Sequence, residues 1–235
     1  MNTTFRTLAS LALLSPMANA ALVALNFQGN GAANLAATTI AGSTAGTIVA
    51  QENWNNAFNS NNVAASIPNL VSSTGSLSGI TAAWLSADTW NAGGTVGASG
   101  NAQMSYGFMK ASAAASGTVT FSGFTSGSLF DMVIYTATDN AAPIGTFALN
   151  DTLGTSVSYA VGAGNTATFT NNSTRHAFTN LTAVGGSVTL TMSGGGAGLA
   201  GVQFSVIPEP SSALLIGLGA LGLLARRTRR TRRQA

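Results

Sequence analysis

The sequence predicts an all-β protein, with a jelly-roll-type β-sandwich body over residues 21–206, a signal helix before it and a single membrane helix after it. Three observations support this. Apolar residues of the body alternate with hydroxyl residues at a period of two, which indicates half-buried strands. Clusters of Gly, Asn and Ser separate the short apolar runs. Each end of the chain carries an uncharged apolar run beside basic residues.

The clearest strands have one apolar and one hydroxyl-rich face, and they lie at 118–121, 187–192 and 202–206. Residues 129–138 are apolar on both faces, as expected of a central strand that is covered on both sides. Further strands are predicted at 22–27, 47–50, 77–84, 103–110, 144–149, 156–161, 166–170 and 175–182. A helix suggests itself only at 52–62, where asparagines weaken it. About ten short strands at this spacing favour a sandwich.

The first twenty residues have the organisation of a secretory signal peptide. Arg6 supplies the basic region, residues 8–14 the apolar region, and 15–17 a helix-breaking segment. Ala18 and Ala20 then match the small-x-small rule for cleavage. The mature chain is therefore expected to begin at Ala21.

The C-terminal residues have the organisation of a membrane anchor. Pro208, Glu209 and Pro210 precede an uncharged run at 211–225, and six arginines follow, at Arg226, Arg227, Arg229, Arg230, Arg232 and Arg233. As a helix the run covers about 22 Å, less than the ~30 Å of a bilayer core, but snorkelling arginines and local thinning allow it to span. The basic cluster predicts a cytoplasmic C-terminus. The alternative is a buried core helix with a solvated basic tail.

This order of proline motif, apolar run and arginine cluster resembles the PEP-CTERM sorting signal of exported proteins in Gram-negative bacteria. The resemblance covers residues 207–233 and implies recognition by an exosortase, an integral-membrane processing enzyme. It also implies a transient stay in the inner membrane, followed by release to the cell surface or extracellular matrix. It concerns the tail and assigns no activity to the body.

The body also resembles a group of PEP-CTERM-type exported proteins. The similarity lies in Asn26-Phe27, in the Asn-Trp-Asn-Asn motif at 53–56, and in residues 117–124 and 133–135. The resemblance implies a galactose-binding-type jelly roll, the architecture of many carbohydrate-binding modules.

The charge of the body differs from that of the whole chain. The formal net charge is +3, but residues 21–207 contain two cations, Lys110 and Arg175, against five carboxylates, a net charge of −3. No basic patch exists there, so nucleic-acid binding is excluded. Charged residues make up 6% of the chain, against the usual ~25%, and the chain has no cysteine and hence no disulfide.

The candidates for catalysis and metal binding are few. The carboxylates Asp88, Asp139 and Asp151 neighbour Asn, Thr or Ser, as in turns and caps, and Asp131 lies in a predicted strand. His176 is the single histidine, which excludes a zinc site of three or four soft ligands. No catalytic residue, cofactor or metal site is therefore predicted. A structural calcium ion stays open at 139–140 or 150–151.

A glycan contact is the remaining candidate. Aromatic rings stack on sugars while Asn and Asp bind hydroxyls, so we expect Trp90 with Asn91 and Asp88, in a Gly-rich loop, to be the contact group, with Trp54 as a second candidate. Trp84, between Ala83 and Leu85, is expected in the core. The alternative is that all three tryptophans are core residues.

Three interpretations follow. The first is a non-catalytic exported sandwich at the surface or in the polysaccharide matrix, whose hydroxyl-rich faces suit adhesion to hydrated polymers. The second is a carbohydrate-binding module with a specific glycan ligand. The third is a secreted carbohydrate-active enzyme, which requires two carboxylates within about 10 Å across a cleft.

Overall fold

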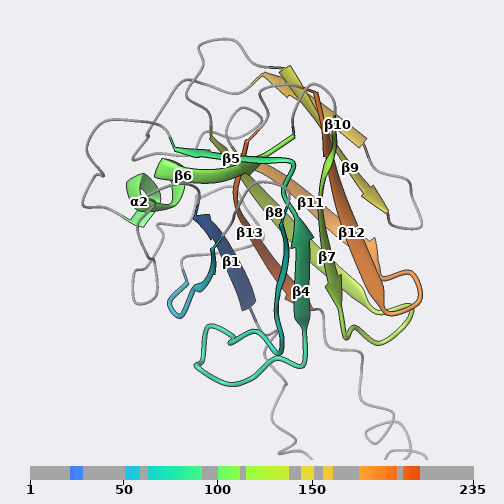
Figure 1. Ribbon diagram of the computed structural model, residues 1–235. Helices are drawn as coiled ribbons and strands as arrows, with labels where there is room; N and C mark the ends of the chain where they lie inside the picture. Colours follow the sequence, from blue (N-terminus) through green and yellow to red (C-terminus); the bar gives the residue numbers. More distant parts are fainter. Residues whose placement is uncertain are drawn as a thin grey trace, which may run out of the picture. The chain divides into compact units, whose positions relative to one another are not determined.

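Two β-sheets make up most of the described part of the chain in the computed structural model (Figure 1). The structure describes residues 22–28, 51–58, 63–91, 100–111, 115–137, 144–150, 156–160, 175–194 and 198–206. The strands predicted at 47–50 and 166–170 lie outside these ranges, as do the predicted signal peptide and sorting tail.

The larger, seven-stranded sheet has the order β11-β8-β13-β1-β2, with β6 also pairing β13 and β5 pairing β6. Its strands are β1 (Leu22–Gln28), β2 (Asn55–Phe58), β5 (Asp88–Asn91), β6 (Gly107–Lys110), β8 (Leu129–Ala137), β11 (Arg175–Thr182) and β13 (Gly198–Val206). All of its pairs are antiparallel except β1 with β2. The short helix α2 (Gly100–Tyr106) lies between β5 and β6 in the chain.

The second, six-stranded sheet has the order β10-β9-β12-β7-β4-β3 and is antiparallel throughout. Its strands are β3 (Ala64–Ile67), β4 (Thr81–Leu85), β7 (Gly117–Ser122), β9 (Ile144–Asn150), β10 (Ser156–Ala160) and β12 (Ser187–Ser193). Strands β7 and β12, which pair with each other, have similar sequences at 118–121 and 187–190.

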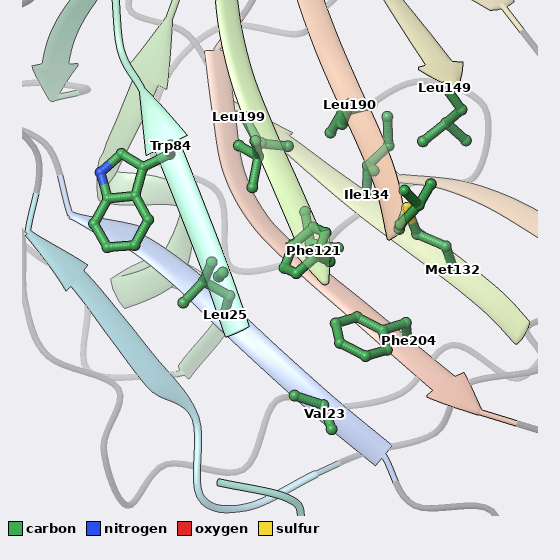
Figure 2. Close-up of a cluster of buried hydrophobic side chains, with 14 of the residues drawn as sticks. Val23, Leu25, Trp84, Phe121, Met132, Ile134, Leu149, Leu190, Leu199 and Phe204 are labelled. Carbon is green, nitrogen blue, oxygen red and sulfur yellow. The ribbon is translucent and has the colours of Figure 1, made fainter. Parts of the chain in front are cut away.

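The sheets pack face to face over a shared apolar core (Figure 2). Phe121 of β7 meets Phe204 of β13 edge-on, with ring centroids 5.1 Å apart. Phe27 of β1 meets Trp84 of β4 in the same manner at 6.0 Å. Such edge-to-face contacts follow the ring quadrupoles and stabilise beyond the area buried. The predicted all-β class and the core position of Trp84 are confirmed.

The predicted alternation is confirmed in the six-stranded sheet. In β7 and β12 the apolar residues are buried, and the Ser and Thr residues between them are partly exposed. The central position predicted for 129–138 is also confirmed, since β8 lies between β11 and β13 and is buried on both faces for most of its length.

Two predicted elements are wrong. Residues 55–58 form β2 in place of a helix, because the Asn55 amide bonds the backbone of two other segments, at Ala24 and Val71. Residues 103–106 belong to helix α2, and only 107–110 form a strand. Ala, Gln and Met favour that helix, and Ala102 and Met104 bury their side chains.

The prediction for 202–206 is wrong in one respect, since the polar face of β13 does not meet solvent. Gln203 and Ser205 are buried along with Val202 and Phe204. A second apolar cluster covers this outer face of the seven-stranded sheet, with members Ala24, Trp54, Met104, Phe108, Val133, Tyr135, Ala137 and Ala200. The segment before β2, helix α2 and strand β6 supply the covering residues, so the central strands β1, β8 and β13 are buried on both faces over most of their length.

A polar network runs through the second cluster. The Tyr135 hydroxyl donates to Gln203 Oε1 at 2.9 Å, and Gln203 Nε2 donates to Gln51 Oε1 at 2.9 Å. Trp54 Nε1 donates to the Gln51 carbonyl at 3.0 Å, and its ring meets that of Tyr135 edge-on at 6.2 Å. These bonds hold the segment before β2 against β8 and β13.

We expect Trp54→Ala to lower the free energy of unfolding by about 3–5 kcal/mol, because it empties a large buried site and removes an indole hydrogen bond. Urea denaturation measures this. Trp90→Ala is the matched control, and because Trp90 is exposed its cost should be about 1 kcal/mol or less. Equal costs for the two variants would contradict the described second cluster.

Burial raises the pKa of Tyr135, and the charge and hydrogen bond of Arg175 offset part of the rise. The unfolded chain then loses its phenolic proton near pH ~10, before the folded one does. This contribution to stability is complete below that pH and is lost as pH rises through the folded pKa. Urea midpoints from about pH 8 to 11 should therefore fall more steeply for the natural chain than for Tyr135→Phe. Parallel curves would show that Tyr135 is not buried as described.

Candidate functional site

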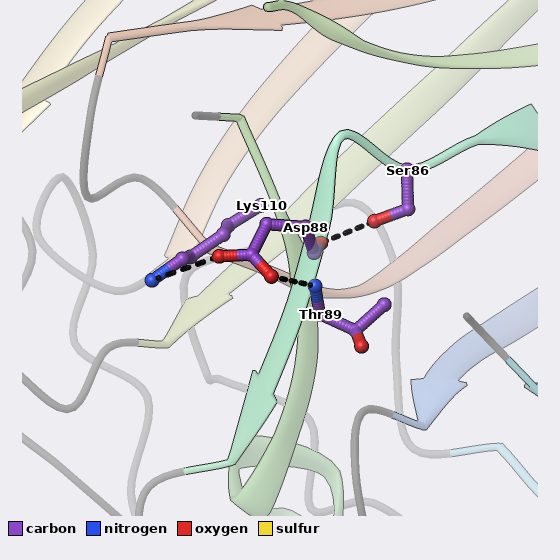
Figure 3. A network of polar contacts seen from close by, with 4 residues as sticks. All are labelled: Ser86, Asp88, Thr89 and Lys110. Carbon is purple, nitrogen blue, oxygen red and sulfur yellow. Dashed lines mark hydrogen bonds and ion pairs between the residues drawn. The ribbon is translucent and has the colours of Figure 1, made fainter. Parts of the chain in front are cut away.

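The candidate site lies on the β5–β6 ribbon, where Asp88, Trp90 and Lys110 come together. Figure 3 shows Asp88 and Lys110 of this group. Asp88 lies directly opposite Lys110 across the ribbon, and Asp88 Oδ2 is 3.5 Å from Lys110 Nζ. The same ammonium lies over the Trp90 ring, 5.1 Å from the centroid. Trp90 and Asp88, two residues apart on one strand, share a face of the ribbon.

Local bonding holds Asp88 in place. Its Oδ1 accepts a hydrogen bond from the backbone N–H of Thr89 at 2.9 Å, and the Ser86 hydroxyl donates to its carbonyl oxygen (Figure 3). Thr89 and Met109, which lie opposite each other, are both buried and anchor the other face of the ribbon. The loop predicted around Trp90 is thus a strand. On the face away from Thr89 and Met109, the side chains of Trp90, Asp88 and Lys110 are accessible, while Phe108, which pairs with Trp90, is buried.

Trp90 differs from the other two tryptophans in its exposure. Trp90 is 44% exposed, whereas Trp54 and Trp84 are buried. Of the two cations in residues 21–207, both in described segments, Arg175 is 3% exposed and Lys110 is accessible. The accessible cation, Lys110, and the exposed tryptophan, Trp90, lie in contact with each other. Lys110 was missed from the sequence, although its being the sole lysine of the chain was a usable signal.

These three side chains offer the chemistry of sugar binding. An exposed indole presents an apolar face, the Asp88 carboxylate accepts hydrogen bonds, and the Lys110 ammonium donates them. The ion pair is partly exposed, so exchanging it for contacts with a ligand costs little, on the order of 0–1 kcal/mol.

The structure separates the other predicted contacts. Trp54 is 3% exposed within the second cluster and is not available to stack on a sugar, which corrects its place as a candidate. Its burial follows from the hydrogen bond to Gln51 and the packing on Tyr135. Asn91 is the last residue of β5 and lies opposite Gly107.

Two candidates for catalysis, Asp131 and His176, lie in strands β8 and β11 of the seven-stranded sheet. Asp131 Oδ1 accepts a hydrogen bond from the backbone N–H of Asn180 at 2.9 Å, where β11 departs from its register with β8 and Asn180 has a φ of +57°. Asp131 thereby stabilises a bulge. His176 is buried in β11, opposite Ile134.

No group of three or more His, Cys, Asp or Glu side chains that could hold a metal ion gathers in the described segments. Of the two places left open for calcium, 139–140 lies outside the described residues, and at 150–151 only Asn150 is described, at the end of β9.

The predicted export and sorting residues lie outside the described part of the chain. These are the cleavage residues Ala18 and Ala20, the motif 208–210, the apolar run 211–225 and the arginines of 226–233. Among the residues that the structure does describe, no helix has the length and apolar character needed to cross a membrane.

The comparisons with known proteins found a family-model match to the tail and a distant structural similarity. No curated protein matches the chain. A solved structure, the enzymatically active domain of tailspike protein 4 from bacteriophage CBA120, is similar at 15% identity and a TM-score of 0.27. That match covers 55% of this chain and 20% of the other, and at this TM-score it carries no argument.

The tail gives a specific result. Residues 206–230 match the family model of the PEP-CTERM protein-sorting motif. The match includes Pro208, Glu209 and Pro210, the apolar run and the arginines up to Arg230. The chain therefore carries a PEP-CTERM sorting motif at its C-terminal end, which implies an exported protein that an exosortase processes.

Proposed function

We propose that this protein is a non-catalytic β-sandwich that an exosortase releases to the cell surface or extracellular matrix, where its body associates with polysaccharide. The sorting motif at 206–230 is the observation that carries the proposal. In it, residues 1–20 are a cleaved signal peptide, 211–225 hold the protein briefly in the inner membrane, and the arginines of 226–233 stay in the cytoplasm.

We propose further that the body is a jelly roll. The order β1-β13-β8-β11 in one sheet and β7-β12-β9-β10 in the other supports this, because β7 to β13 pass back and forth between the sheets, with the neighbours β9 and β10 together in one sheet, as jelly-roll strands do. Strands β2 to β6 and helix α2 then form an insertion that supplies Met104 and Phe108 of the second cluster and the Trp90 ribbon.

The non-catalytic role rests on two of the three described carboxylates, Asp88 and Asp131; the third, Glu52, is exposed. Asp88 pairs with Lys110, and Asp131 holds a backbone bulge. Neither arrangement prepares an acid and a nucleophile across a scissile bond. The exposed Trp90 beside Asp88 and Lys110 suits binding a sugar, and we assign the contact with polysaccharide to this ribbon.

Deletion of residues 208–235 tests the sorting part of the proposal. We expect the intact protein at the cell surface or in the matrix, shorter by about the mass of the tail. The truncated chain should pass to the medium, because nothing then holds it in the inner membrane. Fractionation of the native cells with immunoblotting measures both. A full-length, unprocessed protein that stays in the inner membrane would contradict exosortase sorting.

Trp90→Ala tests the contact group. It should weaken polysaccharide binding by about tenfold, because aromatic stacking contributes roughly 1–2 kcal/mol and the variant lacks the ring. Trp90→Phe, which keeps an aromatic face, is the matched control and should retain most of the binding. Affinity electrophoresis on the exported body measures retardation by each polymer. Equal retardation of the natural chain and Trp90→Ala would exclude Trp90 from the contact.

A further inference from the structure

The outer face of the six-stranded sheet presents hydroxyl side chains in rows, interspersed with alanines, Asn150 and Leu85. One row runs Ser66, Ala83, Thr120, Thr189, Asn150 across β3, β4, β7, β12 and β9. The neighbouring rows contain Thr81, Ser122 and Ser187 on one side, and Ala64, Leu85, Thr118, Thr191 and Ala148 on the other. Every one of these residues is partly or fully exposed.

No charged side chain interrupts this face among the residues that the structure describes there, and the sequence of β10 contains none either. Protein surfaces ordinarily intersperse Lys, Arg, Asp and Glu, which keep sheets soluble and apart. A face of this size without them is therefore unusual. Leu85 is its one large exposed apolar residue among those described, so the face is not an apolar docking patch.

A hydrogen bond holds two of the central hydroxyls in place. The Thr120 and Thr189 hydroxyls lie 2.9 Å apart and bond each other across β7 and β12. Threonine is β-branched, and its side-chain torsion is restricted, so its hydroxyl costs little entropy to order. Sheet geometry repeats the groups about every 4.8 Å across strands and about every 6.8 Å along them.

The hydroxyls of this face and its lack of charge favour one class of partner. Each hydroxyl both donates and accepts, as sugar hydroxyls do, so the face matches a polyhydroxylated chain. A charged partner would find no counter-charge on it, and the net charge of −3 on residues 21–207 repels an acidic polymer. The Trp90 ribbon belongs to the other sheet, so this is a separate surface.

We propose that the outer face of the six-stranded sheet is a second contact surface, for uncharged polysaccharide. The proposal rests on the proposed association with polysaccharide and adds where a long chain lies and which class of polymer it is. Single hydroxyl contacts are weak, so binding accumulates along the chain and requires a long one. Short oligosaccharides then bind at Trp90 without engaging this face.

The test removes hydroxyls without changing shape. The variant T118V/T120V/T189V/T191V replaces each threonine by a residue of similar shape and strand preference. The natural chain should be retarded in native gels that contain neutral β-glucan, galactomannan or dextran, and less in gels that contain alginate. The variant should lose at least about tenfold in affinity for the neutral polymer, about 1.4 kcal/mol. Its binding of short oligosaccharides should be unchanged.

A second variant, Thr189→Lys, places one long charged group in the centre of the face and should lower polymer binding as well. Thr189→Lys replaces the fourfold variant in this test if the fourfold variant associates with itself. Urea denaturation establishes that each variant folds.

The outcomes separate the two proposals. Normal polymer binding by both variants, with loss in Trp90→Ala, would overturn this surface and leave the association with polysaccharide intact. Retardation by alginate alone would overturn its preference for uncharged polymers. No retardation of the natural chain by any polymer would overturn both proposals. Self-association of the natural chain that the threonine substitutions abolish would assign the face to a second copy, against the proposal.

Discussion

The burial of both faces of the seven-stranded sheet is the constraint on which the rest of the structure depends. Its inner face packs on the other sheet through Phe204, Phe27 and their neighbours. Without the covering residues Trp54, Met104 and Phe108, its outer face would expose Ala24, Val133 and Tyr135 to water. A chain with few charges and no disulfide gains much of its stability from such burial, at about 25 cal/mol per Å² of apolar area.

This constraint also positions the candidate site. The segment that covers the outer face includes β6, whose Phe108 and Met109 are buried on its two faces. Once β6 is fixed, Lys110 at its end faces Asp88, and β5 presents Trp90 to solvent. The two sheets thereby divide the roles of the body. The outer face of one is covered over its central strands, and its β5–β6 pair exposes Trp90, while the outer face of the other is open and presents hydroxyls.

Much of the fold could be predicted from the sequence, because strands with one wet face record their environment in alternation. β7 and β12 are examples. β13 misled this reasoning, since Gln203 and Ser205 look like solvent-facing residues but bond and pack inside a second layer. Nothing local reveals that layer, because Trp54, Met104 and Tyr135 meet only through long-range packing.

The candidate site was partly predictable for a similar reason. Trp90 and Asp88 stood out by residue type and proximity in the chain. Lys110 joins them only because β5 and β6 pair across helix α2, and Trp54 leaves the set only because Gln51 and Tyr135 bury it. The sorting motif, by contrast, is local in sequence and was predicted with its residues.

Cysteine labelling tests the difference between the two outer faces most directly, because the chain has no cysteine of its own. Ala24→Cys places a thiol under the second cluster, and Ala83→Cys places one on the open hydroxyl face. In the folded protein a soluble thiol reagent should modify Cys at 83 rapidly and leave the one at 24 protected, and both should react in urea. Equal rapid labelling of the two in the folded protein would contradict the account.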